Sequence, residues 1–170
     1  PTKKDFSALY LDNFTASLVR QGLTRQDVLA LITLMRAPYH DQAALHVFPH
    51  IREVIAHLRS FASLYVITSN LTSLIASSIA YHDIKGISEV LGGDIESSKV
   101  KKLALLKQKH TGAQFYYIGD TVGDVLEARE AGVKSIAVTW GYHSRKELLK
   151  AKPDFIVDTP TALLPLFSSP

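Results

Sequence analysis

The sequence contains no cysteine among its 170 residues. Disulfide bonds and thiolate metal sites are therefore excluded, although this absence says little about the cellular compartment. The sequence also has no apolar run long enough to span a bilayer, and no basic segment followed by an apolar one that would indicate a secretory signal. We therefore expect a soluble protein of the cytoplasm that does not associate with membranes.

The charge is nearly balanced, with 19 basic and 16 acidic side chains and a formal net charge of +3. One stretch of helical pattern gathers several lysines, but no aromatic residues interleave with them and no nucleic-acid recognition motif accompanies them. We interpret this stretch as a solvated helix face and expect no nucleic-acid partner. The lysines are Lys99, Lys101, Lys102, Lys107 and Lys109.

The chain length suits one domain with a full hydrophobic core, or one domain with a small appendage. From Phe48 onward short apolar segments alternate with helical patterns, which predicts parallel βαβ units in an α/β fold. The expected strands are 64–67, 89–91, 115–118, 135–139 and 155–157. The expected helices are 49–60, 71–80, 100–110, 122–131, 145–151 and 161–167.

The residues before about Val47 follow a different, helical pattern. Thr24 to Asp27 resembles a capping box, and apolar residues continue at helical spacing to Met35. The stretch Ala8–Leu11 suits either a helix or a strand. We therefore predict a helical segment over residues 1–46 and an α/β core over 47–170.

Two carboxylates four positions apart mark the most informative stretch, Tyr117-Ile118-Gly119-Asp120-Thr121-Val122-Gly123-Asp124. Gly119 permits a tight turn, Asp120 follows a strand, and Asp124 lies one turn into the next helix, so both carboxylates can face one point. Paired carboxylate oxygens suit a hard cation such as Mg²⁺. On spacing alone, Asp124 can equally be an ordinary helix-capping residue.

Other polar residues are also expected at the ends of strands or the starts of helices. In an open α/β sheet, ligands bind beyond the carboxyl ends of the strands. Thr68, Ser69 and Asn70 follow one strand, and a hydroxyl with backbone N–H groups at a helix start can hold phosphate oxygens, while Lys99 adds positive charge. Taken singly, Thr68 to Asn70 could be a helix N-cap and Lys99 a surface lysine. Together with the two carboxylates they predict a phosphoryl-transfer site.

These motifs resemble those of the haloacid dehalogenase superfamily of phosphohydrolases. Leu64 to Asn70 is similar to its second motif, Lys99 to its third, and Tyr117 to Asp124 to its fourth. Further strings resemble the phosphoglycolate phosphatase-like branch of that superfamily. They are Phe48-Pro49, Ala131-Gly132-Val133, Val138-Thr139-Trp140-Gly141-Tyr142 and Pro153-Asp154-Phe155-Ile156-Val157.

The resemblance implies a Rossmann-like three-layer sandwich with a mainly parallel sheet, in which residues 1–46 are a remnant of a helical cap. It implies a Mg²⁺-dependent phosphatase of a small phosphorylated metabolite, acting through an aspartyl-phosphate. Thr68 and Lys99, with Ser69 and Asn70, would bind the transferring phosphoryl group. Asp120 and Asp124 would position Mg²⁺ directly or through water.

The superfamily's nucleophile lies in an Asp-x-Asp-x-Thr string after a strand, and this sequence contains no such string. Asp12 follows Ala8–Leu11 but has no second carboxylate two positions later, so it is a weak candidate. We expect instead that residues 1–46 are the later part of the superfamily's helical cap and that the first strand precedes this chain. The chain begins with Pro1 and not Met, which is compatible with either processing or truncation. The gap that this leaves would be filled by Ala8–Leu11, by a rearranged sheet, or by self-association.

Two other functional classes remain open. One is a catalytically inactive member of the fold with a binding or assembly role. The other is a phosphate-sensing domain of the response-regulator kind, which the Trp140-Gly141-Tyr142 string and the helical N-terminal segment disfavour. The sequence does not identify the substrate, because a cap and its loops would select the leaving group.

Overall fold

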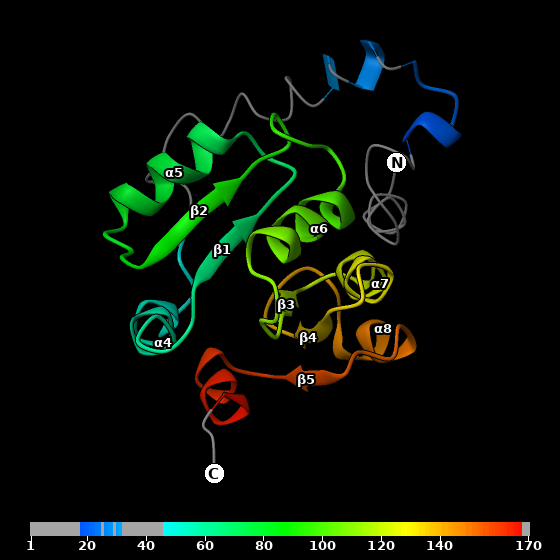
Figure 1. Cartoon of the computed structure of the whole chain (residues 1–170). Coiled ribbons are helices and arrows are strands. Elements are labelled where there is room, and N and C mark those ends of the chain that lie inside the picture. Colours follow the sequence, from blue (N-terminus) through cyan, green and yellow to red (C-terminus); the bar gives the residue numbers. More distant parts are fainter. Residues whose placement is uncertain (1–17, 25, 29, 32–45, 168–170) are drawn as a thin grey trace. The chain divides into compact units, whose positions relative to one another are not determined.

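The computed structural model describes residues 18–24, 26–28, 30–31 and 46–167 (Figure 1). The chain divides into two compact units, and each is described by itself. Unit 1 combines the chain up to Pro38 with Gly112–Ile156, and unit 2 combines Tyr39–Thr111 with Val157–Pro170. The domain boundary expected near residue 46 stays a prediction.

Unit 2 is built on two parallel strands joined by a helix. Val66 and Ile67 of the first strand pair with Val90 and Leu91 of the second, so the carboxyl ends of both strands lie at the same edge. One helix packs against the second strand, and the helix near residue 50 packs against the C-terminal helix. The elements are α4 (Ile51–Leu58), β1 (Leu64–Ile67), α5 (Thr72–Tyr81), β2 (Ile87–Leu91), α6 (Lys99–Lys109) and the 3₁₀ helix η3 (Pro160–Leu166).

Unit 1 contains a three-stranded sheet in the order β3-β4-β5, with β3 and β4 parallel. α7 packs against both of these strands and against α8, and a small apolar core of Val125, Ala137, Leu148 and Ala151 lies between them. The elements are β3 (Tyr116–Gly119), α7 (Val122–Glu130), β4 (Lys134–Val138), α8 (Arg145–Lys150) and β5 (Phe155–Val157).

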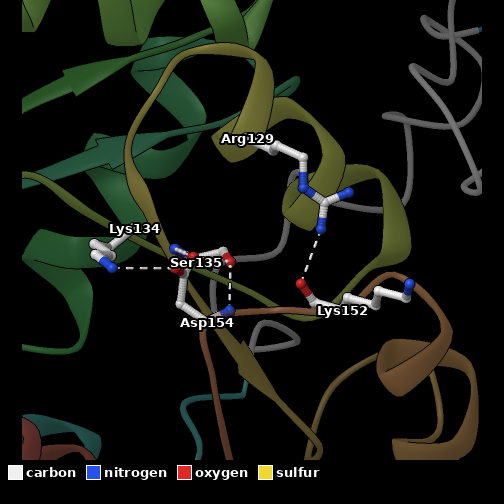
Figure 2. Close-up of polar contacts among 5 residues, drawn as sticks. All are labelled: Arg129, Lys134, Ser135, Lys152 and Asp154. Carbon is white, nitrogen blue, oxygen red and sulfur yellow. Dashed lines mark hydrogen bonds and ion pairs between the residues drawn. The ribbon is translucent and has the colours of Figure 1, made fainter.

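Polar bonds fasten the chain before β5 to the rest of unit 1 (Figure 2). The buried Ser135 of β4 donates its backbone N–H and its hydroxyl to Asp154 Oδ2, both at 2.8 Å, and accepts from the Asp154 N–H at 2.9 Å. The guanidinium of Arg129 donates to the carbonyls of Ala151 and Lys152, which satisfies acceptors left open at the end of α8.

The expected alternation of strands and helices is confirmed, and so is the α/β fold with parallel strands. The C-terminal helix differs in type: it is a 3₁₀ helix, with Pro165 inside it. Proline has no N–H to donate, which interrupts an α-helical ladder but is compatible with a short 3₁₀ segment.

Part of the N-terminal prediction falls on described residues. Thr24 and Asp27 exchange the bonds of a capping box, and residues 26–28 and 30–31 are helical. The side chains of Leu18 and Val28 are buried in one apolar cluster. Ala8–Leu11 and the stretch from residue 32 to Met35 lie outside the described residues. Across the described ranges, no helix has both the length and the apolar character needed to cross a membrane.

Candidate functional site

Asp120 follows β3 on the loop into α7, as its position in the sequence predicts. The loop after β4 holds it in place. The Tyr142 N–H donates to Asp120 Oδ2 at 2.7 Å, and the His143 N–H donates to the Asp120 carbonyl at 3.1 Å. A Cβ on Gly141 would overlap the Asp120 carboxylate. Glycine at position 141 therefore allows the two loops to approach this closely.

Asp124 is buried and acts as the third residue of a capping box on α7. Its Oδ2 accepts from the N–H of Thr121 at 3.0 Å and from the hydroxyl of the same residue at 2.7 Å, and Tyr117 donates its hydroxyl to Oδ1 at 3.1 Å. A Cβ on Gly119 would overlap the Asp124 side chain. Gly119 is thus needed for close approach, and its φ is not among the positive glycine angles of the described residues.

Asp124 therefore makes the hydrogen bonds of a helix-capping residue, as the alternative interpretation predicts. Asp120 is the better candidate to bind a cation. Asp120 Oδ1 has no hydrogen-bond partner within the described ranges, whereas both oxygens of Asp124 already accept bonds. Among the described residues no group of three or more histidines or carboxylates gathers as a metal site. Mg²⁺ commonly uses one or two carboxylates and keeps several waters, so this donor set fits it. Mg²⁺ binding at Asp120 and Asp124 stays a prediction.

In unit 2, the loop from β1 to α5 carries Thr68. Its hydroxyl accepts from the Asn70 N–H at 3.0 Å, and its own N–H donates to the Leu91 carbonyl at 3.1 Å. Ser69 and Asn70 are exposed. The alternative that Thr68 to Asn70 supplies the N-cap of α5 is not what the structure shows, because Leu71 occupies that position without a side-chain bond.

The α5 N-terminus is instead capped from the loop after β2. Asp94 Oδ1 accepts from the Thr72 N–H at 2.8 Å and from the Thr72 hydroxyl at 2.9 Å. A Cβ on Gly92 would overlap Thr72, and one on Gly93 would come within 2.5 Å of the Ser69 carbonyl oxygen. The two loops at the carboxyl ends of β1 and β2 therefore interlock and hold Thr68 in a defined place.

A buried lysine reaches this loop. Lys102 on α6 is fully buried, and its ammonium donates to the Thr68 carbonyl at 2.7 Å. Our interpretation of this residue as part of a solvated helix face was therefore wrong. Helical spacing could have indicated this burial, because Lys102 lies four residues before the buried Leu106 and therefore on the same face of the helix. Lys99 is the half-buried first residue of α6, and its role stays a prediction.

The structure thus brings together Thr68 and Lys102 within unit 2, and Asp120 with the loop after β4 within unit 1. The prediction that Thr68 and Asp120 meet at one sheet edge involves both units and remains a prediction. Asp12 lies outside the described residues.

Comparison with known proteins shows which family this sequence resembles. A sequence profile of the haloacid dehalogenase-like hydrolases matches residues 4–138. A phosphoglycolate phosphatase of Synechococcus elongatus is 34% identical over 167 residues, which cover 95% of this chain and 79% of that protein. A phosphoglycolate phosphatase of Salmonella typhi is 31% identical over 162 residues, covering 89% of this chain and 64% of that protein.

Solved structures show the same fold. A haloacid dehalogenase-like hydrolase from Streptococcus pneumoniae superposes with a TM-score of 0.79 at 25% identity, over 99% of this chain and 82% of that one. A haloacid dehalogenase-like hydrolase from Bacteroides fragilis gives a TM-score of 0.79 at 20% identity, over 96% of this chain and 83% of the other. The relatives and the shared fold support a phosphatase.

Proposed function

The chain belongs to the haloacid dehalogenase-like hydrolases, and from this membership we propose that it is a Mg²⁺-dependent phosphatase of small phosphorylated metabolites. The observation that carries the proposal is the 34% identity to a phosphoglycolate phosphatase over 95% of the chain. Phosphoglycolate is therefore the first substrate to test. The cytoplasm is the proposed location, since the substrate is a metabolite.

The described residues support distinct roles in this function. The Asp120 carboxylate, held by the Tyr142 N–H, would bind the cation, and Asp124 would act through water or by fixing the start of α7. The bound Mg²⁺ would neutralise charge on the phosphoryl oxygens. Thr68, Ser69, Asn70 and Lys99 would bind the phosphoryl group, and the buried ammonium of Lys102 adds a fixed positive charge beside Thr68.

The covalent step needs a carboxylate nucleophile. Its oxygen attacks phosphorus, and the bond from phosphorus to the leaving oxygen breaks as that oxygen takes a proton from solvent. Water then attacks the aspartyl-phosphate and releases inorganic phosphate and the free carboxylate. Asp12 is the candidate for this role within the chain. If no residue supplies the nucleophile, the chain retains binding of phosphate and cation without turnover, which is the alternative of a binding or assembly role.

Hydrolysis of phosphoglycolate and of 4-nitrophenyl phosphate tests the proposal, measured with Mg²⁺ and with EDTA. Because the chain contains no Asp-x-Asp-x-Thr string and Asp12 is a weak candidate, we expect very slow turnover, seen only with Mg²⁺ and lost in Asp120→Asn. Loss of turnover in Asp12→Asn as well would identify the nucleophile. Phosphate and Mg²⁺ binding without any turnover would favour the inactive alternative, and turnover that EDTA leaves unchanged would refute the metal requirement.

A further inference from the structure

His143 is the one buried polar side chain of the described residues that keeps an unpartnered nitrogen. Only 2% of the residue is exposed, and its Nε2 has no hydrogen-bond partner among the described residues. A buried donor without a partner lowers stability. An apolar side chain of similar size would avoid this cost, but it would also remove the bond that the other ring nitrogen makes.

The other ring nitrogen indicates what the histidine does. His143 Nδ1 accepts from the N–H of Val122 at 2.9 Å. Val122 is the first residue of α7, and its N–H has no partner within the helix. Since Nδ1 accepts a hydrogen bond, the proton of the neutral ring is on Nε2, which is the unpartnered nitrogen.

The same residue also bonds to the loop through its backbone. The His143 N–H donates to the Asp120 carbonyl, and the neighbouring Tyr142 N–H donates to Asp120 Oδ2. Three bonds therefore join the loop after β4 to the segment from Asp120 to Val122. The ring bond is the only one of the three to which a side chain of the loop after β4 contributes. It reaches Val122, two residues after Asp120, at the start of α7.

We propose that His143 is a positioning residue: its Nδ1 holds the start of α7 so that the Tyr142 N–H and Asp120 Oδ2 keep their bond and Asp120 Oδ1 would remain available to bind a cation. The proposal rests on the proposed function, because the cation is part of it. Replacing a group that hydrogen-bonds to a metal ligand typically changes metal affinity or activity by about 10- to 100-fold, and the His143 ring acts one bond further away, so we expect the lower end of that range.

Three substitutions separate positioning from packing. His143→Leu fills the space without an acceptor, His143→Asn places an amide oxygen near the position of Nδ1, and His143→Gln places its amide farther out, near the position of Nε2. Leu148→Val is the control, because Leu148 belongs to the apolar core of unit 1 and makes none of these bonds. It should lower stability without changing Mg²⁺ affinity.

We expect His143→Leu and His143→Gln to bind Mg²⁺ about tenfold more weakly by calorimetry. Their kcat should fall while the KM for the phosphate ester changes little. His143→Asn should recover most of the affinity. Equal affinity in wild type and His143→Leu, or no recovery in His143→Asn, would overturn the proposal.

Amide hydrogen exchange at Val122 and Tyr142 separates this proposal from the proposed function. If the wild-type chain neither binds Mg²⁺ nor turns over substrate, this result refutes the proposed function but does not decide the role of His143. The positioning role is then decided by exchange: faster exchange of both amides in His143→Leu, restored protection in His143→Asn, and no change in Leu148→Val support it. Unchanged protection of Tyr142 in His143→Leu refutes it.

Discussion

At the scale of single residues, the functional side chains are placed by contacts that sequence spacing does not reveal. The spacing of Asp120 and Asp124 predicts that both follow β3, and the structure confirms this placement. It does not reveal that Asp124 caps α7 while Asp120 is held by the loop after β4, since that loop lies some twenty residues later in the chain. Contacts across such a separation depend on packing and not on local pattern.

Lys102 leads to the first prediction. Lys102→Met keeps the length of the side chain but removes the ammonium that bonds to the Thr68 carbonyl. Bonds from charged groups contribute about 1.5–3 kcal/mol, so kcat/KM for a phosphate ester should fall by at least about tenfold. Steady-state kinetics and competition by inorganic phosphate measure the effect.

Lys101→Met is the matched control for this substitution. Lys101 is exposed, and its ammonium lies 3.8 Å from Glu96 Oε2, an arrangement that contributes little in solvent. Its kinetics should match those of wild type, and thermal unfolding of both variants shows whether either change is a folding defect. If the two variants have the same kcat/KM, Lys102 has no part in phosphate binding.

Gly141 gives a second prediction at this scale. In Gly141→Ala the new methyl group overlaps the Asp120 carboxylate, so the carboxylate has to move and lose its bond to the Tyr142 N–H. We expect Mg²⁺ affinity to fall about tenfold, as for other groups that orient a metal ligand. Calorimetry measures this change.

Gly112→Ala is the control: Gly112 has φ +83° and open space around it, so its substitution strains the backbone without touching Asp120. A normal Mg²⁺ affinity in Gly141→Ala would show that Asp120 tolerates the displacement.

At the scale of helices and strands, hydrophobic pattern and turn residues are sufficient to locate the elements. β1 and β5 have the expected bounds, and Gly132, with φ +65°, follows α7 where a helix stop was expected. The 3₁₀ form of η3 was missed, although Pro165 was visible in the sequence. Pattern identifies which face of a segment is apolar, but the hydrogen-bond geometry of a short terminal helix depends on what it packs against.

The attachment of β5 gives a prediction about pH. The N–H of Ser135, and then its hydroxyl, hold the pKa of Asp154 below its ordinary value. Because the folded pKa lies below the unfolded one, the ionised carboxylate stabilises the fold fully above about pH 4. This contribution is lost as the pH falls through the folded pKa. Asp154→Asn should therefore lower the free energy of unfolding at pH 7, by no more than about 1 kcal/mol because the carboxylate is exposed to solvent, and should have a smaller effect at pH 2.

Urea unfolding at both pH values measures this difference. Lys134→Met is the control, because the exposed ion pair from Lys134 to Asp154, at 3.4 Å, should contribute no more than about 0.5 kcal/mol. An equal loss of stability in Asp154→Asn at pH 7 and at pH 2 would show that charge has no part in this attachment.

At the scale of the whole molecule, the sequence predicts a single site formed by residues of both units. The carboxylates belong to unit 1, and Thr68 with both candidate lysines belongs to unit 2. Motif order along the chain leads to the hypothesis of one phosphoryl-transfer site because parallel strands share a carboxyl edge. That hypothesis concerns how the units come together, which neither hydrophobic pattern nor contacts within one unit determine.

Mg²⁺ binding should be visible in the stability of unit 1 before any substrate is found. A ligand that binds only the folded state raises the free energy of unfolding by about 2.7 kcal/mol at one hundred times its Kd. Trp140 is the single tryptophan of the chain and lies beside Gly141 in unit 1, so its fluorescence reports on this unit. We expect Mg²⁺ to shift the fluorescence transition to higher temperature in wild type and in Asp154→Asn, and not in Asp120→Asn. Circular dichroism reports on both units. An unfolding transition that circular dichroism detects and tryptophan fluorescence does not should keep the same midpoint temperature when Mg²⁺ is added. An equal shift in Asp120→Asn would place the cation elsewhere and remove Asp120 from the proposed mechanism.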